Sequence, residues 1–273
     1  MPFRSLFDGK TLAGWRPIPR LPTPRWPYDP PLQVDAGDWN KIVRHTGQWT
    51  VEEGAICGRQ NPPGSGLGGY LISEEVFGDF ELVFEARPDW PADTGIMLRA
   101  SSIATQGYQV LLDHRQSGNI GGFYGNGIGR FHAINFNIDA RRDNSGAPVG
   151  LKSEDPATSI EPLTDQKRAL LARAASADEF LSVWKWGDWN EFAITVAGEI
   201  PVLTTRINGL EIAQLDARTL PAADFDAAAT LRLLGRRGHI AFEVHDNDPR
   251  LGSGRWGPEA ACRWRNIRIR ELD

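Results

Sequence analysis

Cysteine is scarce in this chain, and its scarcity excludes several kinds of small stabilised domain. Only Cys57 and Cys262 occur in 273 residues, so neither a disulfide framework nor a cysteine-rich zinc module can form. Two options remain, one bridge between them or two buried thiols. The second is favoured, because a chain of this length buries a sizeable core without cross-links.

Excess positive charge and long apolar runs are also missing. Thirty Lys and Arg against 35 Asp and Glu give a net charge of −5, so we expect no nucleic-acid partner. No apolar run of about 18 residues occurs, so we expect no membrane span. Residues 1–5 lack a signal-peptide pattern, which predicts a cytoplasmic protein, or a periplasmic or secreted one if a signal was trimmed. Oligomeric state is left open.

Common catalytic motifs are absent too. There is no Gly-x-Ser-x-Gly elbow, no HExxH pair and no phosphate-binding P-loop. Residues 121–127 are rich in glycine but do not match the dinucleotide fingerprint, so we interpret them as a loop and expect no nucleotide cofactor. The histidines are scattered along the chain, which disfavours a multi-histidine metal site.

Glycine, proline and aromatic residues are plentiful and indicate a β-rich fold. The chain has 29 Gly, 19 Pro, 10 Trp and 12 Phe, and short alternating segments lie between turn residues. We expect strands at residues 49–52, 55–58, 70–73, 80–87, 95–99, 107–113, 189–196, 202–207, 210–215, 239–245 and 263–270. Such short strands favour a single all-β domain over residues 1–273, an antiparallel β-sandwich.

Two segments interrupt the strand pattern. Residues 17–31 contain seven prolines and are expected to be an extended surface segment. Residues from about 130 to 186 form a long helical insertion that we expect to border a ligand cleft. It contains one convincing helix, residues 165–174, which Thr164 or Asp165 can cap.

Strand alternation also predicts a polar sheet face. On a strand, every second side chain shares a face, so one polar face can collect Glu81, Glu85, Arg99, Gln109, Asp113, Glu243 and His245. A curved sheet would bring them together in a cleft. The alternative that this face is simply solvated stays open.

Several motifs spread along the chain carry a family resemblance. They are Leu6-Phe7-Asp8-Gly9-Lys10-Thr11-Leu12, Gly78-Asp79-Phe80-Glu81-Leu82, Thr94-Gly95-Ile96-Met97-Leu98-Arg99, Gly187-Asp188-Trp189-Asn190-Glu191, Gly238-His239-Ile240-Ala241-Phe242-Glu243-Val244-His245 and Arg265-Asn266-Ile267-Arg268-Ile269. Together they resemble the 3-keto-disaccharide hydrolase domain family. That resemblance implies a concanavalin A-like jelly roll, as in lectins and glucanases.

The resemblance implies an enzyme whose glycoside substrate already carries a ketone at carbon 3. A base removes the proton on carbon 2, the substituent on carbon 1 leaves by elimination, and water adds, which is net hydrolysis. By position, His245 is the expected base or acid, with Glu243 or Glu81 as its partner. Arg99, with a divalent metal ion as an option, is expected to face the enolate. The expected substrate-binding residues are Glu85, Gln109, Asp113, Trp186 and Trp256.

One departure from the family pattern leaves other functions open. Where the family commonly has Gly-Tyr-Glu-Val-Gln-Ile-Leu-Asp, this chain has Gly107-Tyr108-Gln109-Val110-Leu111-Leu112-Asp113, so a carboxylate and an amide are replaced. A conventional hydrolase would instead need two carboxylates about 5 to 9.5 Å apart. A carbohydrate-binding, lectin-like module is the non-enzymatic alternative.

Overall fold

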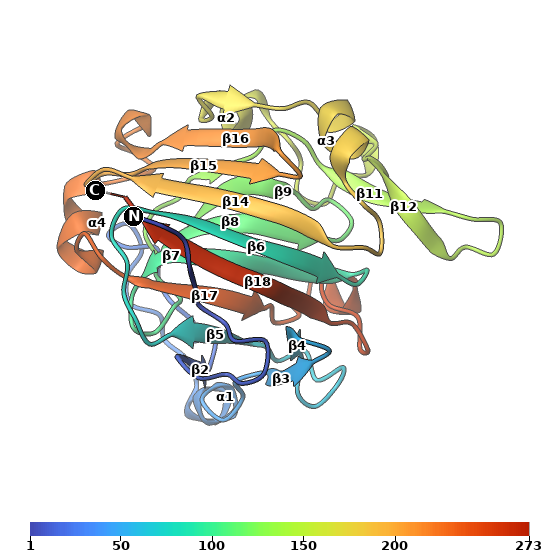
Figure 1. The fold of residues 1–273 in the computed structure, drawn as a ribbon, viewed down its shortest axis with the longest axis horizontal. Helices are drawn as coiled ribbons and strands as arrows, with labels where there is room; N and C mark the ends of the chain where they lie inside the picture. The colour runs from blue at the N-terminus through green and yellow to red at the C-terminus, as the bar shows by residue number, and fades with distance from the viewer. Residues whose placement is uncertain (273) are drawn as a thin grey trace.

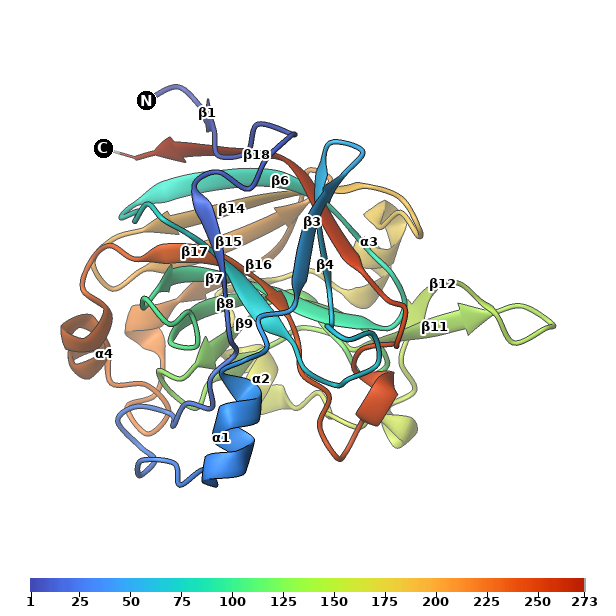
Figure 2. The ribbon, with the colours of Figure 1, turned by 90° about the horizontal axis from the view of Figure 1, so that it is seen from below.

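Two antiparallel β-sheets, packed face to face, form the body of the computed structural model, which describes residues 1–272 (Figure 1). Figure 2 shows the layers one above the other, with β6, β14 and β18 in one and β7, β8, β9 and β17 in the other. The predicted β-sandwich is confirmed.

The strands are arranged in two large sheets and one hairpin. In order of hydrogen bonding, the nine-stranded sheet holds β13 (Arg173–Ala174), β16 (Leu210–Asp216), β15 (Val202–Ile207), β14 (Asn190–Ala197), β6 (Phe80–Pro88), β18 (Cys262–Glu271), β4 (Ala55–Arg59) and β3 (Gln48–Glu52), and β1 (Arg4–Ser5) also pairs with β18. The seven-stranded sheet holds β10 (His132–Ala133), β9 (Ile120–Asn126), β8 (Gly107–His114), β7 (Ala92–Ala100), β17 (His239–Val244), β5 (Gly69–Ser73) and β2 (Trp15–Ile18). The separate hairpin is β11 (Ile138–Arg142) with β12 (Pro148–Ser153).

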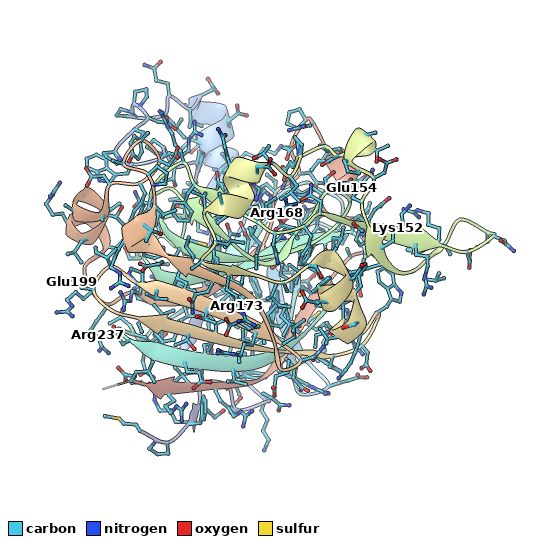
Figure 3. The ribbon with its side chains drawn as sticks, turned by 90° about the horizontal axis from the view of Figure 1, so that it is seen from above. Lys152, Glu154, Arg168, Arg173, Glu199 and Arg237 are labelled. Carbon is cyan, nitrogen blue, oxygen red and sulfur yellow. The ribbon has the colours of Figure 1, made fainter. Side chains whose placement is uncertain are left out.

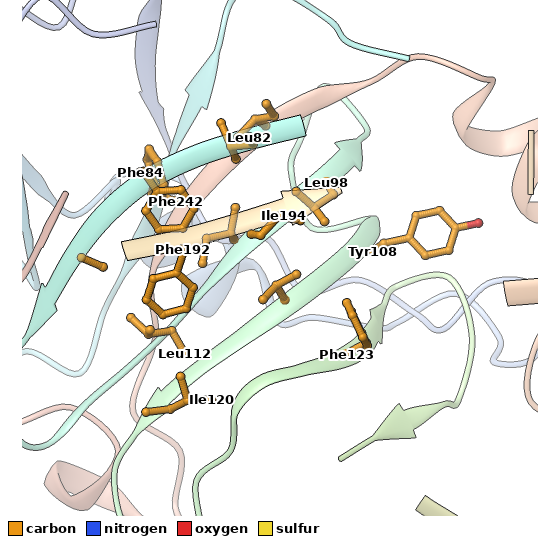
Figure 4. Close-up of a cluster of buried hydrophobic side chains, with 14 of the residues drawn as sticks. Leu82, Phe84, Leu98, Tyr108, Leu112, Ile120, Phe123, Phe192, Ile194 and Phe242 are labelled. Atoms are coloured by element: carbon orange, nitrogen blue, oxygen red, sulfur yellow. The ribbon is translucent and has the colours of Figure 1, made fainter. Parts of the chain in front are cut away.

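The hydrophobic core lies between the two sheets. On β6, Leu82 and Phe84 are fully buried, and the stacked rings of Phe84 and Phe192 join β6 to β14. From the other sheet, Phe242 of β17 meets Phe84 edge to face. Figure 4 shows side chains of both sheets in this layer. Alternation therefore directs one face of each strand inward, as the sequence predicts.

The turn between β15 and β16 has the conformation that an Asn-Gly pair favours. Asn208 and Gly209 have φ values of 49° and 84°, as a type I′ turn requires. The side-chain amide of Asn208 also donates to the backbone oxygen of Val183 at 2.8 Å. The hairpin is thereby tied to the chain that leads into β14.

The prediction of a single helix is wrong, because the described residues contain four α-helices. They are α1 (Ala36–Ile42), α2 (Asp165–Ala169), α3 (Ala177–Val183) and α4 (Ala227–Leu234). Thr164 caps α2 as expected, accepting a hydrogen bond from the backbone N–H of Lys167 at 3.2 Å. The helix ends at Ala169 rather than residue 174, because the backbone N–H of Ala172 donates to Gln214 and β13 then pairs with β16. No helix in residues 1–272 is long and apolar enough to span a membrane.

Residues 121–127 are mainly strand rather than the expected loop. They form most of β9, which pairs with β8 and β10. The glycines there permit close packing: a Cβ on Gly122 would approach Asn119 Oδ1 to 2.4 Å, and one on Gly125 would approach the Phe131 ring to 2.6 Å. Glycine in a strand marks a close approach as well as a turn.

The two cysteines are buried free thiols, as favoured from the sequence. Cys57 lies on β4 and Cys262 on the neighbouring β18. Burial raises the pKa of Cys57 to about 11.

The two interrupting segments both lie near the seven-stranded sheet. The proline-rich segment leaves β2, and Ile18 packs with Tyr70, Met97 and neighbouring residues in a small apolar cluster. Residues 130–186 contain β10 to β13, α2 and α3, which lie along one edge of the sandwich (Figure 1).

Candidate functional site

A cavity of about 440 Å³ lies on the outer face of the seven-stranded sheet. On β8, Gln109 and Asp113 face this cavity, whereas Val110 and Leu112 face the core. The complete lining is Arg20, Asp93, Gln109, Leu111, Asp113, Arg115, Tyr124, Asn126, His132, Glu161, Pro162, Lys167, His245, Arg250 and Arg255.

Glu243 lies at the base of this site, fully buried and saturated with hydrogen bonds. Its Oε1 accepts from Arg20 Nε at 2.6 Å and from the Tyr70 hydroxyl at 3.0 Å. Its Oε2 accepts from Gln109 Nε2 at 2.6 Å. Because a buried carboxylate needs such donors, Glu243 anchors Arg20 and Gln109 beneath the cavity rather than reaching into it.

His245 follows β17 and enters the cavity as a neutral imidazole. Its Nδ1 lies 2.6 Å from the backbone oxygen of Asp246, so Nδ1 carries the proton, and Nε2 accepts from Arg20 at 3.0 Å. Burial, and then the positive charge of Arg20, lowers the pKa of His245. Its basic nitrogen is therefore Nε2.

Two carboxyl groups, Asp93 and Asp113, lie directly opposite each other on β7 and β8. Burial, followed by the negative charge of Asp93, raises the pKa of Asp113 well above its usual value. Burial acts in the same direction on Asp93, but Arg115, with its Nε 2.5 Å from Oδ2, and other positive neighbours outweigh it and lower the pKa of Asp93. The two pKa values shift in opposite directions, so Asp113 is the member of the pair that holds a proton more strongly.

Residues 130–186 complete the cavity with Glu161 and His132. Glu161 accepts from Arg115 at 2.8 Å and from Arg255 at 3.3 Å. His132 lies edge-on to the Tyr124 ring, with the ring centroids 5.6 Å apart. Burial, and then the charge of Lys167, lowers the pKa of His132 to about 4, so this second imidazole is also neutral at pH 7.

The expectation that seven polar residues share one sheet face needs correction. Glu81 and Glu85 lie on β6 in the other sheet, where they pair with Arg270 and Arg265 on β18. The cavity lies outside the seven-stranded sheet, so a side chain on the outer face of the opposite sheet cannot reach it. Alternation gives the side of a strand but not the sheet to which the strand belongs.

Arg99 also lies away from the cavity, although β7 belongs to the correct sheet. Its guanidinium donates to the backbone oxygens of Gly78 at 2.9 Å and Gly198 at 2.8 Å, and it pairs with Asp79 at 2.6 Å. It is almost fully buried at the far end of β7. Arg99 therefore joins the two sheets and faces no cavity-bound enolate.

Neither tryptophan expected to bind sugar lines the cavity. Trp256 is fully buried, and its Nε1 donates to the backbone oxygen of Ala260 at 3.0 Å. Trp186 follows α3 and packs on Trp90 and His114, with ring centroids 6.0 and 5.2 Å away. Both indoles pack against protein, the usual role of a large aromatic side chain.

The sequence-based prediction missed several residues of the site. Asp93 shares the alternation of β7 with Gly95 and Met97, so extending that strand by two residues would have found it. Arg20 lies in the proline-rich segment, where no periodicity points to a site. Arg115 follows β8, and Arg255 follows the 3-10 helix Gly252–Gly254. Neither position carries a sequence pattern that predicts a site.

A divalent cation does not fit this cavity. Asp93 and Glu161 are both bound by Arg115 and Arg255, and Glu243 is bound by Arg20. Arginine occupies the carboxylate oxygens that a hard cation would need. Across residues 1–272, no three His, Cys, Asp or Glu side chains are arranged to hold a metal ion.

A larger cavity of about 650 Å³ lies beside α2 and α3. Glu154 and Arg168 line it (Figure 3), but no histidine does. The smaller cavity combines a carboxyl group of raised pKa, Asp113, with two imidazoles of lowered pKa, His132 and His245. Groups with such shifted pKa values favour it as the functional site.

Comparison with known structures finds similar folds at low sequence identity. A Parabacteroides distasonis protein, provisionally named a glycosyl hydrolase, is 11% identical over 99% of this chain and 94% of its own, with a TM-score of 0.49. The CBM66 carbohydrate-binding module of Bacillus subtilis is 11% identical over 81% and 89%, with a TM-score of 0.42. A Bacillus licheniformis β-glucanase is 8% identical over 82% of each chain, with a TM-score of 0.39.

A comparison with curated proteins finds no match. The family comparison is decisive: the model of the 3-keto-alpha-glucoside-1,2-lyase-like domain matches residues 2–270. That match agrees with the resemblance seen in the motifs and supports a role in glycoside chemistry. This chain belongs to the 3-keto-alpha-glucoside-1,2-lyase-like domain family.

Proposed function

We propose that this chain cleaves glycosides already oxidised to a ketone at carbon 3. The reaction removes the proton on carbon 2, eliminates the substituent on carbon 1, and then adds water. Family membership supports the glycoside class. The observation that carries the proposal is that Asp113, buried opposite Asp93 with its pKa raised, lines the same cavity as His245, whose pKa is lowered.

In the first step, His245 Nε2 takes the carbon 2 proton, and the electrons of that C–H bond move to the carbon 3 oxygen as an enolate. Nδ1 keeps its proton and donates it in a hydrogen bond to the backbone oxygen of Asp246, which leaves Nε2 as the basic atom. Before substrate binds, Arg20 donates a hydrogen bond to Nε2. When substrate displaces this contact, the hydrogen bond to Glu243 still holds Arg20 beside the cavity.

In the second step, the enolate collapses to a double bond between carbons 1 and 2, and the bond from carbon 1 to its substituent breaks. Asp113 donates its proton to the departing oxygen and becomes a carboxylate, with its Oδ2 3.8 Å from Arg115. Water then adds to carbon 1 and returns a proton to Asp113, and the proton on His245 Nε2 returns to carbon 2. The sum is hydrolysis, with the carbon 3 ketone retained.

Paired-carboxylate hydrolysis is less well supported by this cavity. Asp93 and Asp113 contact each other through a shared hydrogen bond, so they lack the separation of roughly 5 to 9.5 Å that two catalytic carboxylates need around a sugar. Glu243 is fully buried. Elimination needs one acid and one base on the same substrate, and this arrangement suits it better.

The decisive experiment compares a 3-keto-glucoside with its unoxidised parent in deuterated water. Only the ketone makes the carbon 2 proton removable by an ordinary base, so we expect the ketone to be cleaved and its parent to be inert. Deuterium should appear at carbon 2 of the product. Equal cleavage of both substrates would favour direct hydrolysis, and binding without cleavage would favour the lectin-like alternative.

Three histidine variants test the identity of the base. We expect His245→Ala to lower turnover of the 3-keto-glucoside by about 10²- to 10⁴-fold, the usual contribution of a general acid or base. His239→Ala is the matched control, because His239 lies outside the cavity and contacts the Ser73 backbone oxygen. If His132→Ala shows the large loss and His245→Ala does not, the base is His132.

A further inference from the structure

The cavity is basic although the chain is acidic. The whole protein carries a net charge of −5, whereas the cavity lining has five basic side chains and three acidic ones. For one of the three, Asp113, burial opposite Asp93 raises the pKa well above its usual value. Local positive charge of this kind attracts an anion.

Three of the basic residues are already committed to carboxylates. Arg20 pairs with Glu243 at 2.6 Å and with Asp246 at 3.4 Å. Arg115 and Arg255 both bind Asp93 and Glu161, and Arg255 also binds Asp248 at 2.5 Å. These contacts are buried or half-buried, so the guanidinium groups are neutralised where they lie. The cations that stay available to an anion are therefore the two remaining ones.

Lys167 and Arg250 are those two cations. Lys167 Nζ donates to the backbone oxygen of Pro162 at 2.8 Å, and within residues 1–272 neither side chain forms an ion pair with a carboxylate. Burial lowers the pKa of Lys167, and the positive charge of Arg250 lowers it further against the opposing effect of Glu161. Glu161 is itself shared by two arginines, so it does not neutralise the pair.

We propose that Lys167 and Arg250 bind an oxyanion carried by the substrate, so that anionic glycosides are the preferred class. The identity of the ligand as a glycoside rests on the proposed function; the anion site itself does not. An arginine binds a carboxylate or sulfate through two parallel hydrogen bonds, and a lysine adds a point charge.

The position of the pair suits a charged group at the edge of a bound sugar. Arg250 is exposed and Lys167 is half-buried, while Asp113 and His245 lie on the sheet side of the same cavity. A cavity of about 440 Å³ lies within the size range of small-ligand sites. The carboxylate of a uronic acid or a sulfate ester would reach the cations while carbons 1 and 2 face the acid and base.

Equilibrium binding of unoxidised ligands tests this site without any turnover. Calorimetry would compare methyl glucuronide, methyl glucoside 6-sulfate and methyl glucoside, all of one anomeric form, at low and high salt. We expect both anionic ligands to bind at least about tenfold more tightly than the neutral one at low salt, with the advantage shrinking at high salt. The two anions distinguish a carboxylate-specific site from a general oxyanion site.

Lys167→Met and Arg250→Gln should each reduce the ratio of affinities for the anionic and the neutral ligands by about three- to tenfold. The affinity for methyl glucoside itself should stay unchanged. Lys152→Met is the matched control, because Lys152 lies on the β11–β12 hairpin outside the cavity lining (Figure 3). Equal affinity for charged and neutral ligands in the unmodified protein, or an advantage that survives both substitutions, would overturn the proposal. If 3-keto-glucosides are not cleaved but the anionic preference holds, only the proposed reaction fails.

Discussion

Asp113 keeps its proton because it is buried opposite an ionised Asp93. Its pKa is raised above the unfolded value, so its contribution to stability is full below about pH 4 and is lost as pH rises towards the folded pKa. Asparagine has no proton to lose. We therefore expect Asp113→Asn to gain thermal stability relative to the unmodified protein as pH rises from about 4 to 8.

Melting temperatures of both proteins across that pH range would measure the effect. Asp93→Asn is the control with the opposite sign, because it leaves Arg115 and Arg255 without their shared carboxylate and should destabilise by about 3–5 kcal/mol. A constant difference between Asp113→Asn and the unmodified protein at every pH would show that Asp113 is ionised in the folded state.

The same proton gives Asp113 its proposed catalytic role. Asp113→Asn should lower turnover of a 3-keto-glucoside by about 10²- to 10⁴-fold if Asp113 is the general acid. A substrate with a better leaving group needs less protonation, so the loss should be smaller with a nitrophenyl glycoside than with an alkyl one. An equal loss with both leaving groups would assign Asp113 to another step.

Gln109 has a structural reason to be an amide. Its Nε2 donates to Glu243 Oε2 at 2.6 Å, and a glutamate there would place two buried carboxylates together. We expect Gln109→Glu to destabilise the protein by about 1–3 kcal/mol near pH 8, and to recover as pH falls and the pair shares a proton. Urea unfolding near pH 8 and at a lower pH would measure the free energies of unfolding of both proteins. A Gln109→Glu variant as stable as the unmodified protein and more active would show instead that the position favours a carboxylate.

At the scale of elements, β9 shows how glycine serves a strand as well as a loop. A Cβ on Gly122 would meet Asn119 Oδ1 at 2.4 Å and the backbone oxygen of Ala133 at 2.7 Å. Gly122→Ala should therefore reduce the free energy of unfolding by about 1–3 kcal/mol. Gly254→Ala is the control, because no atom lies within 4 Å of its added Cβ, and similar losses in both variants would contradict the packing argument.

Strands were predictable from the sequence to a greater extent than helices. Alternation located strands such as β6 and β17 within one or two residues, because burial on one face imposes a period of two. The helices α1 and α3 are only seven residues each, too short for a clear helical period. For α3, Ser176 and Glu179 form a capping box, a sequence signal that could have located it.

The candidate site was partly predictable for the same reason. Alternation placed Gln109, Asp113 and His245 beside the cavity. It could not separate Glu81 from them, because which strands join in one sheet depends on long-range pairing. Arg20 reaches the site from an irregular segment and becomes visible only when the chain is folded.

For the molecule as a whole, the two thiols report on global unfolding. Cys57 and Cys262 are fully buried on neighbouring strands, and the pKa of Cys57 is raised to about 11, so little thiolate exists at pH 8. We expect no reaction with a thiol reagent in the folded protein and reaction of both thiols in denaturant. The reaction should follow the same urea transition as tryptophan fluorescence, and rapid reaction of either thiol without denaturant would contradict the burial.

The position of β18 has a consequence for synthesis on the ribosome. This last strand lies between β6 and β4, and it also pairs with β1. Until residues 262–271 leave the exit tunnel, β6 and β4 have no common partner, and their unpaired edges are open to other chains. Closure of the nine-stranded sheet therefore waits for residues 262–271, and nascent chains stalled before residue 262 should depend on chaperones that cover strand edges.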